Sequence, residues 1–144
     1  MAQYAQVETV LPSTESMTAD RPSAEFPNHF QRESLNLVNS LFTLSSSGFY
    51  LVGPDMRHRG VVLRNLAAED ERNYAENFRD LDPLNPAIFA DTEDTLVCID
   101  EQMSESELLA SEYYRGFMVP LGHRHVADMF FRREGDIVAV LTML

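Results

Sequence analysis

The last residues of the chain, Ile137 to Leu144, read IVAVLTML and contain no charged residue, glycine or proline. Such a run is typical of a buried strand or of the start of a buried helix, since it has no polar face for water. If it is a strand, we expect it to lie centrally in a sheet with both of its faces covered. A domain rarely ends inside its own core, so we expect this chain to be the front part of a longer protein.

The composition predicts one domain with a hydrophobic core and argues against two classes of partner. The chain has 144 residues, 44% of them hydrophobic, and a formal net charge of -12. All 11 basic residues are arginines. Because phosphate groups are bound by basic patches, this acidity argues against direct binding of nucleic acid and of an anionic membrane surface.

Cysteine content and hydropathy indicate a cytoplasmic protein. Cys98 is the single cysteine, which excludes an internal disulfide and fits a reducing compartment. Its apolar and acidic neighbours disfavour the thiolate, so we interpret it as an inert core residue rather than a redox sensor. No apolar run reaches the length of about 20 residues that a membrane helix needs, and the N-terminus lacks a signal-peptide pattern.

The chain divides into an N-terminal arm and a folded part. Proline, serine and threonine interrupt residues 1–27, which predicts a flexible arm. An amphipathic helix is expected from Asn28 to Leu44, because Phe30, Leu37 and Leu41 fall on one helical face together with Leu44. The further elements predicted from periodicity and breakers are strands at Phe49–Val52, Gly60–Leu66 and Thr95–Ile99, helices at Glu69–Leu81 and Glu105–Met118, and a hairpin of His125–Arg133 with the terminal strand.

The order of these elements predicts the fold class. Hairpins near both ends with helices inserted between them favour a mainly antiparallel five-stranded sheet with helices packed on it. The fold is therefore predicted as α/β, an α/β/α sandwich of the PAS or GAF general type over residues 28–144. The pattern Ser104-x-x-Glu107 is a capping box that marks the start of the last helix.

Two segments resemble the sensor domains of LuxR-type transcription regulators. These are NYAENFRDLDPLNP at Asn73 to Pro86 and SEYYRGFMVPLGHRHVADMFFRREGDIVAVLTML at Ser111 to Leu144. The resemblance implies a GAF-like domain followed by a helix-turn-helix DNA-binding domain, which this chain does not contain. It also implies that the last helix of the sensor, which often supports dimerisation, is missing or cut.

One subfamily of these regulators binds acyl-homoserine lactones, and the chain departs from its pattern. Asp82-Pro83 matches the Asp-Pro element of that subfamily, and Tyr74 lies roughly where a pocket tyrosine would be. The subfamily also has an upstream aromatic pair that includes tryptophan, whereas this chain has no tryptophan. The departure argues against a lactone as the ligand.

Asp82 and a set of aromatic residues are the candidate ligand contacts. The carboxylate of Asp82 could accept a hydrogen bond from a ligand amide, or it could form an Asx turn before Pro83. The aromatic residues could line a cavity between sheet and helices, or they could be ordinary core. The predicted ligand-binding residues are Tyr50, Tyr74, Phe78, Asp82, Tyr113, Phe117, Met129 and Phe131.

Metal binding and catalysis are less favoured interpretations. His123 and His125 would point the same way on a strand and could form a metal site with Cys98 or His58, but no second compact pair supports this. No nucleophile, phosphate-loop, zinc or dinucleotide motif indicates an enzyme. The acidic pairs Asp80/Asp82 and Asp91/Asp94 are interpreted as solvated loop charge. A heme sensor with His123 or His125 as axial ligand is a weaker alternative; no cofactor is predicted.

Two functions therefore remain open from the sequence. The first is a ligand-sensing domain that binds a small, mostly apolar molecule, forms a homodimer and controls a separate DNA-binding domain. The second is a ligand-free dimerisation or docking module of the same fold, which would make its contact through the helix Asn28–Leu44.

Overall fold

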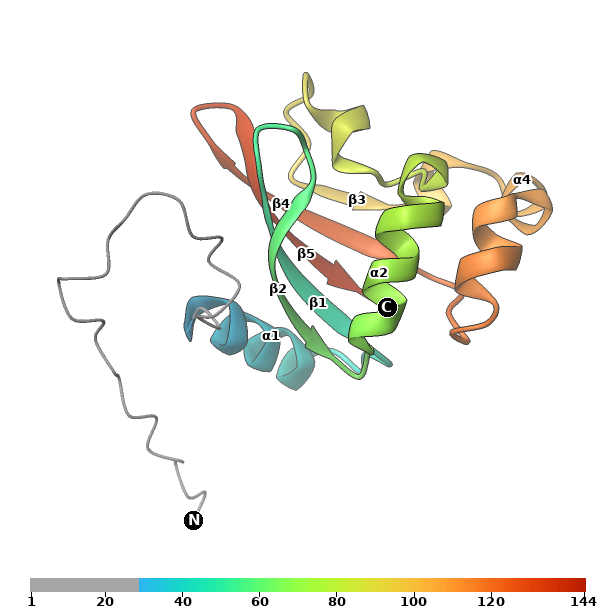
Figure 1. Ribbon diagram of the computed structural model, residues 1–144, viewed down its shortest axis with the longest axis horizontal. Helices are drawn as coiled ribbons and strands as arrows, with labels where there is room; N and C mark the ends of the chain where they lie inside the picture. Colours follow the sequence, from blue (N-terminus) through green and yellow to red (C-terminus); the bar gives the residue numbers. More distant parts are fainter. Residues whose placement is uncertain (1–28) are drawn as a thin grey trace, which may run out of the picture.

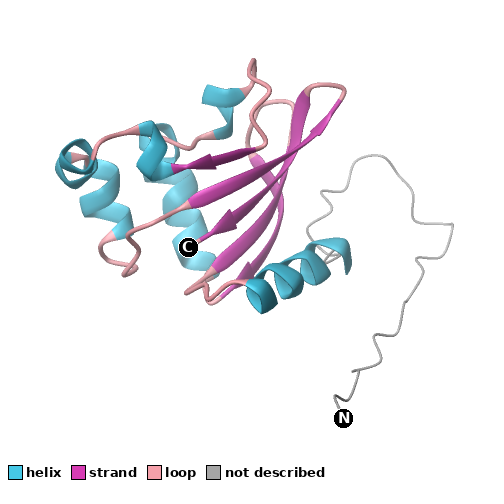
Figure 2. Ribbon diagram, turned by 180° about the vertical axis from the view of Figure 1, so that it is seen from behind, coloured by secondary structure: helices cyan, strands magenta, loops and turns pink. Residues whose placement is uncertain are grey.

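A five-stranded antiparallel sheet with helices on both of its faces forms the protein (Figures 1 and 2). The computed structural model describes residues 29–144, so the predicted arm of residues 1–27 lies outside the described residues. The strand order is β2-β1-β5-β4-β3, and each neighbouring pair is antiparallel. The strands are β1 (Ser47–Val52), β2 (His58–Arg64), β3 (Leu96–Cys98), β4 (Ala127–Arg133) and β5 (Asp136–Met143). The α/β class and the antiparallel five-stranded sheet are as predicted.

The terminal apolar run forms the central strand, as predicted. β5 pairs with β1 on one side and with β4 on the other. Ala139 and Leu141 belong to a core cluster on one face of the sheet, while Val140 belongs to the core cluster on the opposite face. Because successive side chains of a strand point to opposite faces, a strand covered on both sides needs apolar residues at consecutive positions.

The helix α1 (His29–Leu41) covers one face of the sheet (Figure 2). It ends three residues earlier than the predicted Leu44. Leu35 and Gln31 form its buried side, and the Gln31 amide nitrogen donates to the backbone oxygens of Phe49 at 3.1 Å and Gly60 at 3.3 Å. The side of this helix that was predicted to be apolar is not its buried side, since Phe30, Leu37 and Leu41 are exposed.

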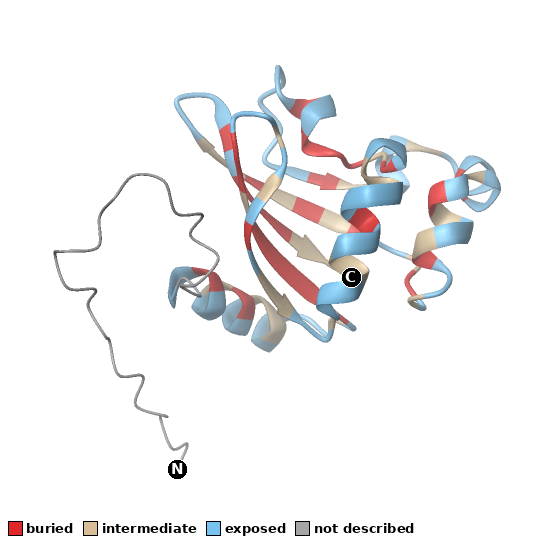
Figure 3. Ribbon diagram, viewed as in Figure 1, coloured by how far each residue is buried: buried red, intermediate tan, exposed pale blue. Residues whose placement is uncertain are grey.

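The other face is covered by helical segments from the middle of the chain. α2 (Ala68–Asn73) continues through a wide π turn, η2 (Tyr74–Phe78), into a 3₁₀ turn, η3 (Arg79–Leu81). This continuous stretch corresponds to the predicted helix Glu69–Leu81. Tyr74 is buried, whereas the other side chains of residues 68–81 are exposed or partly exposed. The ribbon of α2 is accordingly coloured mostly as exposed in Figure 3.

The helix predicted at Glu105–Met118 is two segments, so the prediction of one continuous helix was wrong. α4 (Glu105–Ala110) ends at Ser111, and helical structure resumes to form η5 (Tyr114–Met118). The Ser111 hydroxyl donates to the Leu108 carbonyl at 2.7 Å and accepts from the Tyr114 N–H at 3.1 Å. One side chain thus caps the end of the first segment and the start of the second.

Local signals in the sequence are confirmed at two places. The Ser104–Glu107 capping box is present, with the Ser104 hydroxyl accepting from the Glu107 N–H and the Glu107 carboxylate accepting from the Ser104 N–H at 2.8 Å. The β4–β5 turn has positive φ at Glu134 (53°) and Gly135 (94°), as a tight hairpin turn requires. Two short elements were not predicted, namely η4 (Pro86–Phe89) and α3 (Ile99–Gln102).

Residues 29–144 contain no helix with the length and apolar character needed to cross a membrane.

Candidate functional site

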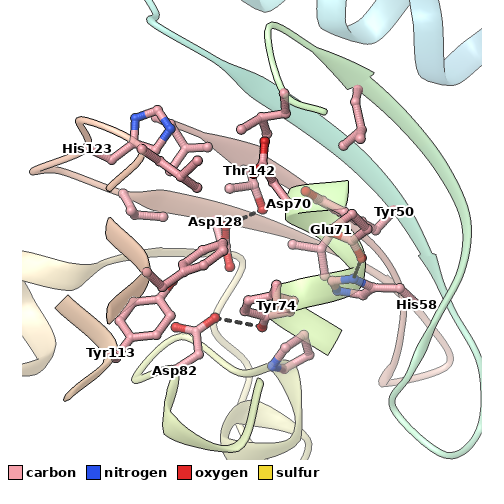
Figure 4. A pocket seen from close by; sticks show the side chains of 18 residues that line it. Tyr50, His58, Asp70, Glu71, Tyr74, Asp82, Tyr113, His123, Asp128 and Thr142 are labelled. Atoms are coloured by element: carbon pink, nitrogen blue, oxygen red, sulfur yellow. Dashed lines mark hydrogen bonds and ion pairs between the residues drawn. The ribbon is translucent and has the colours of Figure 1, made fainter. Parts of the chain in front are cut away.

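A cavity of about 50 Å³ lies between the sheet and the segments α2–η2 and η5 (Figure 4). Taking about 10–15 Å³ for each ordered water, it has room for about four waters or for a ligand of similar size. Its lining is formed by Tyr50, His58, Leu63, Leu66, Asp70, Glu71, Tyr74, Asp82, Pro86, Tyr113, Phe117, Leu121, His123, Val126, Asp128, Val140, Thr142 and Leu144.

The register of the sheet places four of these side chains together. Tyr50 of β1 is paired with Val140 of β5, and Asp128 of β4 is paired with Thr142 of β5. Residues at even positions of β5 therefore share a face with Tyr50 and Asp128, which is the face that η5 and α2 cover. The cavity is thus built on adjacent strands of the sheet centre.

Asp82 is buried beside the cavity and has both carboxylate oxygens occupied. It is 7% exposed; Oδ1 accepts the Leu84 N–H at 2.8 Å, and Oδ2 accepts the Tyr74 hydroxyl at 2.7 Å. The predicted Asx turn before Pro83 is therefore confirmed. Burial raises the pKa of Asp82 from 3.8 to about 6, although the hydrogen bonds from Leu84 and Tyr74 act in the opposite direction. The interpretation of Asp82 as solvated loop charge was wrong.

Asp128 is a second buried carboxylate on the cavity wall. It is 5% exposed, and its Oδ1 accepts the Thr142 hydroxyl at 2.7 Å. Within the described part of the chain, its Oδ2 accepts no hydrogen bond. Burial, followed by the nearby charge of Asp82, raises the pKa of Asp128 well above 3.8. One oxygen of a nearly fully buried carboxylate thus has no protein donor.

Tyr113 faces the same space with an unused hydroxyl. The residue is 4% exposed, and its hydroxyl makes no hydrogen bond to any residue in the range 29–144. Burial raises the pKa of Tyr113 well above 10.0, with further increases from the charges of Asp82 and Asp128. The phenol is therefore neutral at physiological pH and available as a donor or acceptor.

A stack of three rings forms part of the cavity wall. The rings of Tyr50 and His58 are stacked with centroids 4.2 Å apart, and the His58 and Tyr74 rings are stacked at 5.6 Å. The Nδ1 atom of His58 lies 2.7 Å from a Glu71 carboxylate oxygen, which orients the imidazole. Burial raises the pKa of Tyr50 well above 10.0, so its hydroxyl also stays protonated.

The charge of the lining is unbalanced. Four carboxylate residues, Asp70, Glu71, Asp82 and Asp128, belong to it, whereas no arginine of residues 29–144 does. His123 is also buried in the lining, and burial lowers its pKa from 6.5, which keeps the imidazole neutral at physiological pH.

The structure brings together five of the eight residues predicted to bind a ligand. Tyr50, Tyr74, Asp82, Tyr113 and Phe117 line the cavity, and whether they bind a ligand stays a prediction.

The other three predicted residues do not line it. Phe78 packs behind Phe117, with ring centroids 5.5 Å apart. Met129 and Phe131 pack in the cluster beneath α1, where Phe131 stacks on Phe49 at 5.2 Å. Both were assigned to the wrong face of β4, because Asp128 and Phe130 occupy the positions that point toward the cavity side.

Sequence reasoning missed the polar residues of the cavity, above all Asp128, Thr142, His58 and Glu71. One signal was available for Asp128, since a charged residue stands between Val126 and Phe130 on an otherwise apolar face of the strand. No local pattern identified His58 and Glu71, which are thirteen residues apart and meet through the packing of α2 on β2.

The two histidines considered as metal ligands point to different places. β4 begins at Ala127, so neither histidine lies on a strand and the strand geometry considered for them does not apply. His123 is buried in the cavity lining, whereas the exposed His125 has its Nδ1 2.8 Å from Asp100. Within residues 29–144, no group of three or more His, Cys, Asp or Glu side chains is placed to hold a metal ion.

Cys98 is half-buried at the end of β3 rather than in the core. Burial, followed by the charges of Glu101 and Asp100, raises the pKa of its thiol above 9.0. The raised pKa agrees with the interpretation of this cysteine as unreactive.

Replacing Tyr74 by phenylalanine is expected to lower the free energy of unfolding by about 1–3 kcal/mol, because buried Asp82 loses a donor. The same change should raise the pKa of Asp82 further. Urea unfolding followed by circular dichroism measures the loss. The matched control is Tyr114→Phe, which removes a hydroxyl that makes no hydrogen bond within residues 29–144. Equal losses in both variants would contradict the assigned role of the Tyr74 hydroxyl.

A comparison with known proteins found one curated protein with a similar sequence. The Monoamine regulon transcriptional regulator of Klebsiella aerogenes is 30% identical to the chain over 110 residues, which is 76% of this chain and 47% of that protein. The chain thus spans about half the length of the curated relative that it matches. No protein-family model matches the chain. The search of solved structures gave no significant match either.

Proposed function

We propose that this chain is the ligand-sensing part of a transcription regulator of the LuxR type, with a GAF- or PAS-like fold. The likeness to a transcriptional regulator over 110 residues supports the regulatory role. The relative is about twice as long as the matched segment, which leaves room in it for a separate DNA-binding domain. A cytoplasmic location and the absence of catalysis belong to the same proposal.

The cavity is the observation that carries the sensing role. The Asp128 Oδ2 and the Tyr113 hydroxyl belong to buried residues and have no protein partner within residues 29–144, so both are available to a ligand or a water in the cavity. A ligand in contact with Tyr74 and Tyr113 would connect the α2–η2 segment with η5. Binding could then change how these segments pack, which is how a sensor biases an attached domain.

Native mass spectrometry of the chain, compared with its denatured mass, tests this function together with a thermal-shift screen of small molecules. We expect either a discrete adduct or compounds that raise Tm. Val140→Leu, which fills the cavity from the buried sheet face, should abolish this binding. Val138→Leu changes a partly exposed valine of the same strand and should leave it intact. Sensing is contradicted if no compound binds, or if binding is the same in both variants.

A dimerisation module is the second candidate, and the outer side of α1 favours it. Leu37 and Leu41 of α1, and Phe42 directly after the helix, are large apolar side chains on the surface, with Leu41 66% exposed. The same native spectrum gives the oligomeric state of the chain. A dimer without adduct that Leu41→Glu converts to monomer would favour this function over ligand sensing.

A further inference from the structure

We propose that the cavity binds a small organic cation, an alkyl- or arylammonium group, with Asp128 as its counter-ion. This inference rests on the ligand-sensing function proposed above and specifies the chemical class of the ligand. It follows from three features of the cavity, namely its unused hydrogen-bonding atoms, its charge and its ring-lined wall (Figure 4).

The unused atoms match the donors of an ammonium group. Asp128 and Tyr113 are each more than nine-tenths buried, and among residues 29–144 neither the Asp128 Oδ2 nor the Tyr113 hydroxyl has a partner. An ammonium group donates up to three hydrogen bonds and accepts none. The carboxylate oxygen is an acceptor when ionised, and the phenol oxygen is a second acceptor. Both therefore suit a donating ligand.

The charge of the wall selects the sign of the ligand. The cavity lining holds four carboxylate residues and no arginine of the described range, and His58 is already placed against Glu71. An anionic ligand would add negative charge beside Asp82 and Asp128, with no cation to receive it. A cation would instead compensate Asp82 and Asp128. Burial raises the pKa of both carboxyl groups, and the charge of Asp82 raises that of Asp128 further.

The ring-lined wall explains why the cation would be organic. The rings of Tyr50, Tyr74, Tyr113 and Phe117 border the cavity, and aromatic faces attract alkylammonium groups. A metal ion is not favoured, because residues 29–144 offer no cluster of three potential ligands. The small volume of the cavity favours a ligand of few atoms, since a larger ligand would have to displace side chains.

Calorimetric titration and thermal shift with two charge-matched series test the inference. The first series is n-butylamine, 1-butanol and butyrate; the second is benzylamine, benzyl alcohol and benzoate. At neutral pH, each series presents a cation, a neutral molecule and an anion of similar size. We expect the amine of at least one series to bind about tenfold or more tightly than its alcohol, with no detectable binding of the carboxylates.

Asp128→Asn separates the charge from the shape of the site. The amide oxygen can still accept the Thr142 hydroxyl, and removal of a buried charge should leave the variant folded. Amine affinity should fall about 30-fold or more, while alcohol binding stays unchanged. Tyr113→Phe should weaken the amine about fivefold. Asp94→Asn, a change at an exposed position outside the cavity, is the control and should bind the amine as the natural chain does.

Three results would overturn the inference. They are tighter binding of the alcohol or carboxylate than of the amine, equal amine affinity in Asp128→Asn and the natural chain, and no binding of either amine. None of them decides the ligand-sensing function, which the native mass spectrum and the Val140→Leu comparison test independently. Failure of the cation and failure of the sensor are therefore distinguishable.

Discussion

Leu84→Ala is expected to lower the free energy of unfolding by about 2–5 kcal/mol. Leu84 is 0% exposed and belongs to the main core cluster, although it lies in the turn between η3 and η4. The Leu84 N–H donates to the Asp82 carboxylate, which fixes the backbone at this position. The backbone therefore cannot readily shift to fill the space that the shorter side chain leaves. The substitution thus removes apolar contacts and leaves a void. Urea unfolding followed by circular dichroism measures the loss.

Ile88→Ala is the matched control for this prediction. Ile88 lies four residues further along in η4 and is 60% exposed. Its replacement should change the free energy of unfolding by no more than about 0.5 kcal/mol, as is usual at the surface. A loss at Leu84 no larger than that at Ile88 would contradict the assignment of the Asp82–Pro86 turn to the core.

The protein should gain stability from Asp82 as the pH falls from 7 to 5. The pKa of this group is about 6 in the folded protein, above the ordinary 3.8. A raised pKa means that the folded state binds the proton more tightly than the unfolded state does. The resulting stabilisation is complete below the ordinary pKa and is lost as the pH rises through the folded pKa. For a shift of about two units this is about 3 kcal/mol in all, of which about 1 kcal/mol appears between pH 7 and pH 5.

Asp128 should act in the same direction, because its pKa is also raised. The two carboxylates can be separated by comparing pH profiles of the unfolding free energy in variants. Asp82→Asn should show a flatter profile than the natural chain, since its amide does not titrate. Asp94→Asn, which alters an exposed carboxylate, should keep the original profile. Parallel profiles for Asp82→Asn and the natural chain would show that Asp82 titrates normally in the folded state.

Apolar periodicity predicted the sheet well because each face of a buried strand must carry its own set of side chains. The run Ile137–Leu144 indicated a central strand, and β5 occupies the middle of the sheet. The breaks in periodicity at helix ends were less reliable. Ser111 interrupts the helix predicted at Glu105–Met118, because its hydroxyl forms hydrogen bonds with the backbone of both segments. A serine that competes with helical hydrogen bonds in this way leaves no break in the apolar pattern of the sequence.

The candidate site was predicted only in part. The aromatic residues and Asp82 stand out in the sequence by type and by the Asp-Pro element. The assignment of Met129 and Phe131 to the cavity failed because a strand exposes alternate residues to opposite faces, and a shift by one position exchanges the two faces. Asp128, the neighbour of Met129 in β4, is the residue of this strand that lines the cavity.

The sequence by itself determined the α/β class, the central place of the terminal strand, the acidic character and the capping of α4. These properties follow from composition and from patterns within a few residues, because the interactions that produce them are local in the sequence. Only the tertiary structure decided that Asp128, Tyr113 and His58 share one cavity, with two polar atoms left unused. These residues come from separate elements, so their distances, burial and pKa values depend on the register of the sheet and on the packing of α2 and η5 against it.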